Sequence, residues 1–152
     1  MTYFSEIVHL SDIARVHGDR CPEKKAFVFE DRVVTYKEFD INSEKVANGL
    51  VLENVNEQDH VAYMDKNSDR FYELVMGCAK SNSVIVGINW RLAPPEVAYI
   101  LNDSNAKILF VGEDFFGLIE KILKDVPSIE KVICMSGKNK DWPTYEDWRD
   151  KQ

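Results

Sequence analysis

An adjacent tryptophan and arginine, Trp90 and Arg91, form the pair of side chains in this sequence best suited to contact a ligand. An arginine guanidinium forks onto phosphate or carboxylate groups, and an indole ring offers a face for stacking. The pair follows an apolar run at residues 84–88, which has the character of a sheet strand. In open α/β sheets the ligand crevice lies beyond the carboxyl ends of the strands. We therefore expect a ligand contact in the loop that begins at Asn89 and ends at Pro94.

A structural role is the alternative for the same pair. Arg91 would then pair with a nearby carboxylate, and Trp90 would pack beneath the helix that follows. Ion pairs and aromatic contacts of this kind are more often structural than functional, even next to a strand end. The residue types and their spacing leave both interpretations open.

A phosphate loop is suggested by the tripeptide Ser136-Gly137-Lys138, because glycine-rich turns followed by lysine cradle phosphates with backbone N–H groups. The spacing does not fit this interpretation. A P-loop requires a glycine five residues before Gly137, and Val132 stands there. We therefore expect the tripeptide to form a solvated turn.

The three histidines, His9, His17 and His60, have side chains whose ordinary pKa lies near neutrality, so each is a nominal general base. None of them has a neighbour that suggests catalysis. The sequence also lacks a nucleophile motif such as G-x-S-x-G. We expect structural or surface roles for the histidines, and we assign no catalytic residue.

Two pairs of adjacent carboxylates, Glu113-Asp114 and Glu146-Asp147, could be read as metal ligands. Hard cations need several oxygen ligands that converge, which neighbours in sequence do not supply by themselves. Adjacent carboxylates at the start of a helix are explained more simply by their favourable interaction with the positive end of the helix dipole. We therefore predict no metal site.

The composition of the 152-residue chain is that of one soluble globular domain, with 45% hydrophobic and 30% charged residues. A net charge of -7 argues against a nucleic-acid partner, because such modules carry a concentrated basic surface. No apolar window reaches the length of a transmembrane helix, roughly 18 residues. Cys21, Cys78 and Cys134 form neither a disulfide framework nor a metal motif, which favours a reducing, cytoplasmic compartment.

The amino-terminal part of the chain predicts a helix, a short strand pair and a second helix. Apolar residues recur at helical spacing over residues 7–17, and Gly18 is expected to end that helix. Thr35 and Glu38 have the spacing of a capping box, which marks the start of the second helix. The two strands are expected at residues 25–30 and 32–35.

The remainder of the chain alternates short apolar runs with helical patterns. Apolar runs without alternation suit strands that are buried on both faces of a parallel sheet. The expected strands lie at residues 61–64, 84–88, 108–111 and 132–135, and the expected helices at residues 70–80, 95–102 and 114–126. The prediction is an α/β fold with a parallel sheet of about four strands flanked by helices on both faces, in a single domain at residues 1–152.

Three motifs carry a resemblance to a known family. Residues 89–107 read NWRLAPPEVAYILNDSNAK and resemble the segment N-x-R-L-x-P-x-E-x-x-Y-I-L-x-D-S-x-A-K of AMP-forming acyl-CoA synthetases, the fatty-acid CoA ligases of the adenylate-forming superfamily. Residues 35–50 resemble the family's T-Y-x-E-L-D-x-x-S-x-x-L-A-x-x-L helix, and Lys66-Asn67-Ser68 resembles its P-N-S turn. The order and separation of these motifs match the amino-terminal region of the family.

The resemblance implies part of an enzyme that activates a carboxylic acid with ATP, assisted by Mg, and then passes the acyl group to CoA. It also implies that the phosphate-gripping loop, the adenine pocket and the catalytic lysine lie beyond Gln152. Residues 1–152 alone would then be non-catalytic and would hold no cofactor of their own. In the resembling enzymes, the region of Asn89, Trp90 and Arg91 lies near the channel for CoA.

Departures from the family pattern fall at glycines. The family's L-G-V-x-x-G-D reads ENVNEQD at residues 53–59, and its K-x-G-A turn reads KSNS at residues 80–83. Asparagine is the residue after glycine that best tolerates left-handed backbone, so Asn54 and Asn82 are expected to preserve their turns. Gln58 has no such property.

Three functional interpretations follow from the resemblance. The chain is a fragment of a fatty-acid CoA ligase whose partner is the missing carboxy-terminal part, or a stand-alone, non-catalytic interaction or self-association module. A third interpretation is a weak binder of CoA or an adenine nucleotide at residues 89–94. Removing most of an enzyme uncovers apolar faces, so we expect a homodimer or larger assembly. The acyl chain length is not encoded here, because the resembling enzymes build their acyl pocket from later residues.

Overall fold

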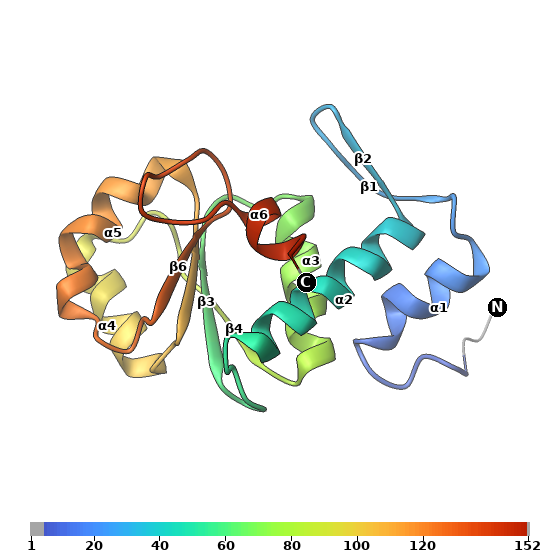
Figure 1. The fold of residues 1–152 in the computed structure, drawn as a ribbon, viewed down its shortest axis with the longest axis horizontal. Helices are drawn as coiled ribbons and strands as arrows, with labels where there is room; N and C mark the ends of the chain where they lie inside the picture. The colour runs from blue at the N-terminus through green and yellow to red at the C-terminus, as the bar shows by residue number, and fades with distance from the viewer. Residues whose placement is uncertain (1–4, 152) are drawn as a thin grey trace.

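The computed structural model describes residues 5–151 and contains a four-stranded parallel sheet, helices on both of its faces and a separate two-stranded hairpin (Figure 1). The strands are β1 (Lys25–Phe29), β2 (Arg32–Thr35), β3 (His60–Met64), β4 (Val84–Gly87), β5 (Ile108–Val111) and β6 (Lys131–Cys134). The α-helices are α1 (Asp12–Arg20), α2 (Tyr36–Leu52), α3 (Asp69–Ser81), α4 (Pro94–Ser104), α5 (Phe116–Ile122) and α6 (Tyr145–Arg149). The predicted α/β fold, its parallel sheet and its strand pair are confirmed.

The sheet has the strand order β4-β3-β5-β6, and every neighbouring pair is parallel. Val61 of β3 lies between Ile85 of β4 and Ile108 of β5, and Ile108 pairs in turn with Lys131 of β6. Because all four strands run in the same direction, their carboxyl ends meet at one edge of the sheet. The loops after the four strands are therefore neighbours in space.

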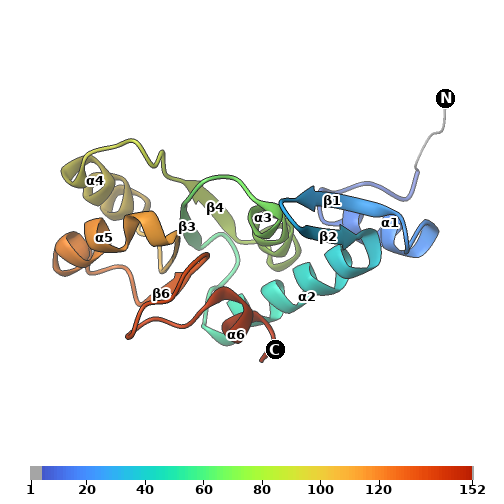
Figure 2. The same ribbon diagram turned by 90° about the horizontal axis from the view of Figure 1, so that it is seen from above.

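Alternation along the strands divides the core into two clusters on opposite faces of the sheet. Figure 2 shows the helices that cover the two faces, with α4 and α5 on one side and α2, α3 and α6 on the other. Val61 and Tyr63 point to the face covered by α2, α3 and α6, whereas Ala62 and Met64 point to the face covered by α4 and α5. These four side chains are almost completely buried. Burial on both faces explains why the strands read as unbroken apolar runs.

The hairpin of β1 and β2 projects from the body of the molecule beside α1 and α2 (Figure 1). Its inner face joins a third apolar cluster, in which Val34 packs with Phe39 of α2 and Met76 of α3. The ring of Phe27 stacks on the ring of Tyr72 at 5.0 Å between centroids. This face anchors the hairpin to the two helices.

The predicted capping box at the start of α2 is confirmed. The backbone N–H of Glu38 donates to Thr35 Oγ1 at 3.2 Å, and the backbone N–H of Thr35 donates to Glu38 Oε2 at 2.8 Å. Ser68 and Thr144 cap α3 and α6 in the same way through their hydroxyl groups. Side-chain acceptors of this kind satisfy backbone donors that have no partner within the helix.

The first helix differs from the prediction. It begins at Asp12 rather than at residue 7, because the Asp12 carboxylate accepts the backbone N–H groups of Val8 and His9 and so closes a turn before the helix. Gly18 lies inside α1 instead of ending it. A β-carbon there would stand 3.3 Å from the carbonyl oxygen of Tyr36, so this glycine permits the close approach of α2.

The helix predicted at residues 114–126 is shorter and more irregular than expected. A 3-10 turn at Glu113–Phe115 precedes α5, and another at Leu123–Asp125 follows it. Pro127 prevents the helical hydrogen bonds from continuing, and short 3-10 turns are common at such helix ends.

Left-handed backbone occurs at each of the expected asparagines, with φ of 59° at Asn54 and 56° at Asn82. Gln58 has the same conformation, with φ of 64°. Its backbone N–H donates to the Asn82 carbonyl at 2.7 Å, and its Nε2 donates to Asn82 Oδ1 at 2.8 Å. These two hydrogen bonds offset the strain of a non-glycine residue in that region.

Candidate functional site

The candidate site lies at the carboxyl edge of the sheet, where the loops after β3, β4, β5 and β6 meet. The loops contribute Asp65 and Lys66, Trp90 and its neighbours, residues 112–115 and residues 136–138. This edge is where ligands bind in open α/β sheets. The order of the strands brings the loop after β5 between those that follow β3 and β6.

Trp90 and Arg91 stack on each other in the loop after β4. The Arg91 guanidinium carbon lies 4.1 Å from the centroid of the Trp90 ring, a cation–π contact. The indole also lies near the ring of Phe115, at 6.2 Å between centroids, and Trp90 packs against the cluster beneath α4 and α5. The backbone N–H of Arg91 donates to Asn89 Oδ1 at 3.1 Å, which holds the turn.

Arg91 is exposed, and within residues 5–151 no carboxylate lies at ion-pair distance from its guanidinium. Its N–H donors are therefore open to an anionic group from solvent or from a larger assembly. Trp90 has the packing that the structural alternative describes, whereas Arg91 is held by the indole face rather than by an acid.

Lys66 connects the loops after β3, β4 and β5. Its ammonium group lies 2.7 Å from the Asp114 carboxylate and 5.9 Å from the centroid of the Trp90 ring. The hydrogen bond from Lys66 to Asp114 raises the pKa of the lysine. The lysine is thus engaged with protein groups, and its charge is balanced at the surface.

Asp65, the residue after β3, is half-buried beside the loop that follows β5. The Lys66 N–H donates to its Oδ1 at 2.7 Å, and the Ser136 hydroxyl donates to its Oδ2 at 3.4 Å. Burial is the main cause that raises the pKa of this carboxyl above its usual value. A β-carbon on Gly112 would stand 2.1 Å from Asp65 Oδ1, so only glycine permits this arrangement.

A cavity of about 220 Å³ lies between these strand ends and the tip of the hairpin. Its basic residues are all paired with acids: Arg32 with Asp69, Lys66 with Asp114 and Arg70 with Glu146. The lining residues are Phe29, Glu30, Arg32, Asp65, Lys66, Asn67, Ser68, Arg70, Glu113, Asp114, Met135 and Ser136.

Ser136, Gly137 and Lys138 form a turn after β6, as the spacing argument predicts, with Gly137 and Lys138 exposed. Gly137 has a φ of 64°, and a β-carbon there would stand 1.9 Å from Glu113 Oε2. The Ser136 hydroxyl accepts the backbone N–H of Glu113 at 3.0 Å. The turn therefore binds its neighbouring loop rather than forming a phosphate cradle.

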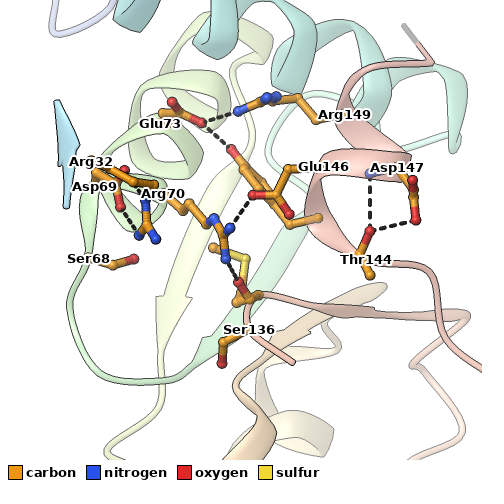
Figure 3. A network of polar contacts seen from close by, with 12 residues as sticks. Arg32, Ser68, Asp69, Arg70, Glu73, Ser136, Thr144, Glu146, Asp147 and Arg149 are labelled. Carbon is orange, nitrogen blue, oxygen red and sulfur yellow. Dashed lines mark hydrogen bonds and ion pairs between the residues drawn. The ribbon is translucent and has the colours of Figure 1, made fainter. Parts of the chain in front are cut away.

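A polar network beside this edge was not foreseen from the sequence (Figure 3). Its centre is Glu73 of α3, which is 2% exposed. One of its carboxylate oxygens accepts the hydroxyl of Tyr145 and the guanidinium of Arg149, each at 2.9 Å, and the other accepts the amide of Asn42 at 2.7 Å. The available signal was the spacing of Asp69 and Glu73, two acids that are four residues apart and therefore lie on the same face of the helix.

A second part of the network links α3 to the hairpin and to the loop after β6. Arg32 of β2 holds the buried Asp69 with two hydrogen bonds, at 2.6 and 2.9 Å. Arg70 donates to the carbonyl oxygen of Met135 and pairs with Glu146 at the start of α6. The two parts of the network hold α6 against α3, and the arginines in it each form an ion pair with an acid.

The histidines lie apart from the strand-end site. His9 precedes α1, His17 is on α1 with its ring 5.0 Å from the ring of Tyr36, and His60 begins β3 at the opposite edge of the sheet. Within residues 5–151 no three His, Cys, Asp or Glu side chains converge in a group that suits a metal ion. The two acidic pairs lie in the first turns of a 3-10 helix and of α6.

None of the helices within residues 5–151 is long and apolar enough to cross a membrane. Cys78 and Cys134 are buried, and Cys21 is partly buried, all as free thiols. Burial raises the pKa of Cys78 to about 12, so its thiol is protonated near neutral pH.

Comparison with known proteins gives matches over nearly the whole chain. The sequence profile of the family described as AMP-binding enzyme matches residues 14–152. Fatty acid--[acyl-carrier-protein] ligase ScoC of Streptomyces coeruleorubidus is 35% identical over 126 residues, which are 83% of this chain and 24% of ScoC. 4-hydroxybutyrate--CoA ligase 2 of Metallosphaera sedula is 29% identical over 132 residues, which are 87% of this chain and 24% of that ligase.

Solved structures have the same fold. The crystal structure of the anthranilate CoA ligase AuaEII aligns with a TM-score of 0.88 and 27% identity, over 98% of this chain and 28% of that one. The N-terminal domain of FACL13 from Mycobacterium tuberculosis aligns with a TM-score of 0.79 and 29% identity, over 84% and 33% of the two chains. The chain thus spans about a quarter of the length of the curated relatives.

Proposed function

Because the chain belongs to the AMP-binding enzyme family, we propose that it forms the amino-terminal portion of an ATP-dependent, AMP-forming fatty acid–CoA ligase. Such a ligase joins a carboxylic acid to AMP and then transfers the acyl group to the thiol of CoA. The observation that carries the proposal is the agreement in fold with a CoA ligase over 98% of this chain and 28% of that enzyme. We regard residues 1–152 as one subdomain of the larger enzyme.

The subdomain is not catalytic by itself in this proposal. Stabilising the charge of ATP requires cationic and backbone donors aimed at the phosphates. At the strand-end cavity, Arg32, Lys66 and Arg70 are instead engaged with acids of the protein. The groups that hold ATP and Mg would therefore come from the remainder of the enzyme.

A fatty acid is the proposed substrate class. ScoC is described as a fatty acid--[acyl-carrier-protein] ligase. Relatives from Mycobacterium marinum and Mycobacterium tuberculosis are described as medium/long-chain-fatty-acid--CoA/3-oxocholest-4-en-26-oate--CoA ligases. Other relatives are named for hydroxybenzoate or indoleacetate. The enzyme would accordingly belong to fatty acid metabolism.

The loop of Asn89, Trp90 and Arg91 is the proposed contact for CoA. Its support is the exposed Arg91 guanidinium, which the Trp90 ring orients and no acid of the described chain neutralises. A guanidinium in this state can donate two hydrogen bonds to a phosphate group of CoA in a bidentate contact. Neither Trp90 nor Arg91 would contact the reacting atoms.

A stand-alone module that associates with itself is the second candidate function. The observation in its favour is a set of large apolar side chains that are more than 40% exposed, at Val28, Val33, Ile41, Val51 and Leu52. Exposed apolar surface of this kind favours association. In either case we propose a cytoplasmic location, which the free, buried thiols of Cys78 and Cys134 support.

The intact mass of the endogenous protein, captured from native lysate with an antibody against this segment, tests the proposal. A product several times heavier than 17.5 kDa that forms acyl-CoA from a fatty acid, ATP and CoA is the expected result. A product of 17.5 kDa that migrates as a dimer or larger species would instead establish the stand-alone module.

A further inference from the structure

The hairpin of β1 and β2 has apolar side chains on both of its faces. Phe27 and Val34 form a cross-strand pair on the inner face and pack into the third cluster. Val28 and Val33 form the next pair, on the outer face, and they are 65% and 47% exposed. An antiparallel pair with one face in water normally carries polar residues on that face. The outer face therefore has the composition of a surface that is covered.

A groove of about 460 Å³ lies next to Val33, the member of the exposed pair that lines it. Val33 lies on its rim, and its walls come from β2, α2, α3 and α6. The charged groups of the groove satisfy one another, since Arg32 pairs with Asp69 and Arg149 pairs with Glu73. The groove thus presents a fixed polar floor without an unpaired buried charge, beside an apolar rim.

We propose that the outer face of the hairpin, with the groove beside it, is the docking surface for the polypeptide that follows α6 in the full-length ligase. The inference rests on the proposed function, in which residues 1–152 belong to a longer enzyme. Two observations select this occupant. The relatives place about three quarters of their length outside the matched region. Helix α6 itself forms one wall of the groove through Glu146 and Arg149. The carboxyl end of the chain lies beside α6 (Figure 1), so in the longer enzyme the chain would continue from there.

The size of the apolar face favours an occupant on the same polypeptide over a second copy of the chain. A stable interface between separate molecules buries about 800 Å² on each partner. Two partly exposed valines supply only a small part of that area. A segment joined to α6 has a high effective concentration at the groove, so a small apolar contact suffices to hold it.

Hydrogen exchange on the full-length gene product and on residues 1–152 tests the inference. Amides of residues 25–35 are expected to exchange at least tenfold more slowly in the full-length protein. The double variant Val28→Glu, Val33→Glu should abolish that difference, since two charges would enter the contact. The matched control is Val51→Glu, Leu52→Glu, which changes two exposed residues of α2 outside the groove and should leave the difference intact.

Equal exchange rates in the two proteins would overturn the inference while leaving the ligase activity, and with it the proposed function, in place. Protection that appears in residues 1–152 alone and grows with protein concentration would also overturn it, because a second copy would then cover the hairpin. A native gene product of 17.5 kDa would remove both proposals together.

Discussion

Gly49 of α2 lies directly against the indole of Trp148 on α6: a β-carbon on Gly49 would stand 2.7 Å from Cζ2 of that ring. The contact lets a helix of only five residues seat its tryptophan between α2 and the sheet, where the Phe110 ring meets it at 5.2 Å. A helix this short has no stability of its own in water. Its position therefore depends on the fit at Gly49 and on the buried carboxylate of Glu73.

The substitution Gly49→Ala is expected to lower the free energy of unfolding by about 1–3 kcal/mol, the usual cost of overpacking. This cost opposes the gain in helix propensity of about 1 kcal/mol that alanine brings. Urea denaturation measures the difference. Gly117→Ala in α5 is the control, since no atom lies within 4 Å of its β-carbon position, and it should be neutral or stabilising. Stabilisation by both variants would contradict the predicted contact.

Removal of the Glu73 carboxylate is expected to cost about 3 kcal/mol, the magnitude seen when one partner of a buried ion pair is deleted. Glu73→Ala removes the acceptor of the Tyr145 hydroxyl and of Arg149 Nη1, while the other nitrogens of that guanidinium keep their hydrogen bonds to Asp150. The control Glu44→Gln removes the charge of an exposed carboxylate, and its partner Lys80 keeps a second ion pair with Asp40, so stability should change by less than about 0.5 kcal/mol. Thermal and urea unfolding of the two variants distinguish these outcomes, and similar losses would refute a special role for Glu73.

Asp65 should contribute to the pH dependence of the free energy of unfolding. Burial raises the pKa of this carboxyl in the folded state, so the folded protein holds its proton more tightly than the unfolded chain. Stability associated with Asp65 is therefore fully present below the ordinary carboxyl pKa of 3.8 and is lost as the pH rises through the raised folded value. We expect Asp65→Asn to be more stable than the parent protein at neutral pH, with the difference shrinking as the pH falls towards 3.8.

Asp59 should have the opposite effect on the pH dependence of stability, because its pKa is lowered rather than raised. The Lys107 ammonium group, whose hydrogen bond to Asp59 is 2.6 Å long, lowers the pKa of this carboxyl. Stability associated with Asp59 is present above its unfolded pKa and is lost as the pH falls through the lowered folded value. Asp59→Asn should thus be less stable than the parent protein at neutral pH. Equal pH profiles for the two variants would contradict both assignments.

The effects on stability of substitutions at Gly112 and at Asp65 should be coupled. Gly112→Ala is expected to destabilise the protein by about 1–3 kcal/mol, because its β-carbon would displace the Asp65 carboxylate. In an Asp65→Ala background the same change should cost at least about 1 kcal/mol less, as expected for residues in direct contact. A double-mutant cycle by urea denaturation measures this difference. Additive effects would mean that the two residues do not meet.

The Arg91→Ala variant tests the proposed CoA contact in the full-length ligase. Loss of a charge-assisted hydrogen bond to phosphate should raise the KM for CoA about tenfold or more. Formation of the acyl-adenylate, followed by pyrophosphate exchange, should be unchanged. Arg15→Ala on α1 is the control, because Arg15 pairs with Asp12 at a distance from the strand ends. An unchanged KM for CoA would exclude Arg91 from the binding site.

Much of the fold was predictable because its signals are local. Unbroken apolar runs identified all four strands of the parallel sheet, and the spacing of Thr35 and Glu38 located the start of α2. The predicted boundaries of α1 were wrong. The hydrogen bond to the Asp12 side chain decides where the helix begins, and the close approach of α2 is the reason for a glycine at position 18 inside it. The strand order was not predictable from periodicity, since it depends on which helix crosses which face.

The candidate site was predictable only in part. The position of Trp90 and Arg91 after a strand followed from the apolar pattern, whereas their mutual stacking did not. The contact between Asp65 and Gly112 joins loops that are distant in sequence. The network around Glu73 joins α2, α3 and α6 and gave one weak local signal. Relationships of this kind become visible only when the chain is folded.

The partners of α6 have a consequence for the order of folding. Tyr145 and Arg149 meet Glu73 across 72 and 76 residues of sequence, and Trp148 meets Glu53 across 95. Contacts of such long range require the closure of large loops, which slows their formation relative to local structure. During synthesis the three helix–strand units from β3 to β6 leave the ribosome before α6 does. The groove beside the hairpin consequently acquires the wall formed by α6 only after β2, α2 and α3, which form its other walls, have been synthesised.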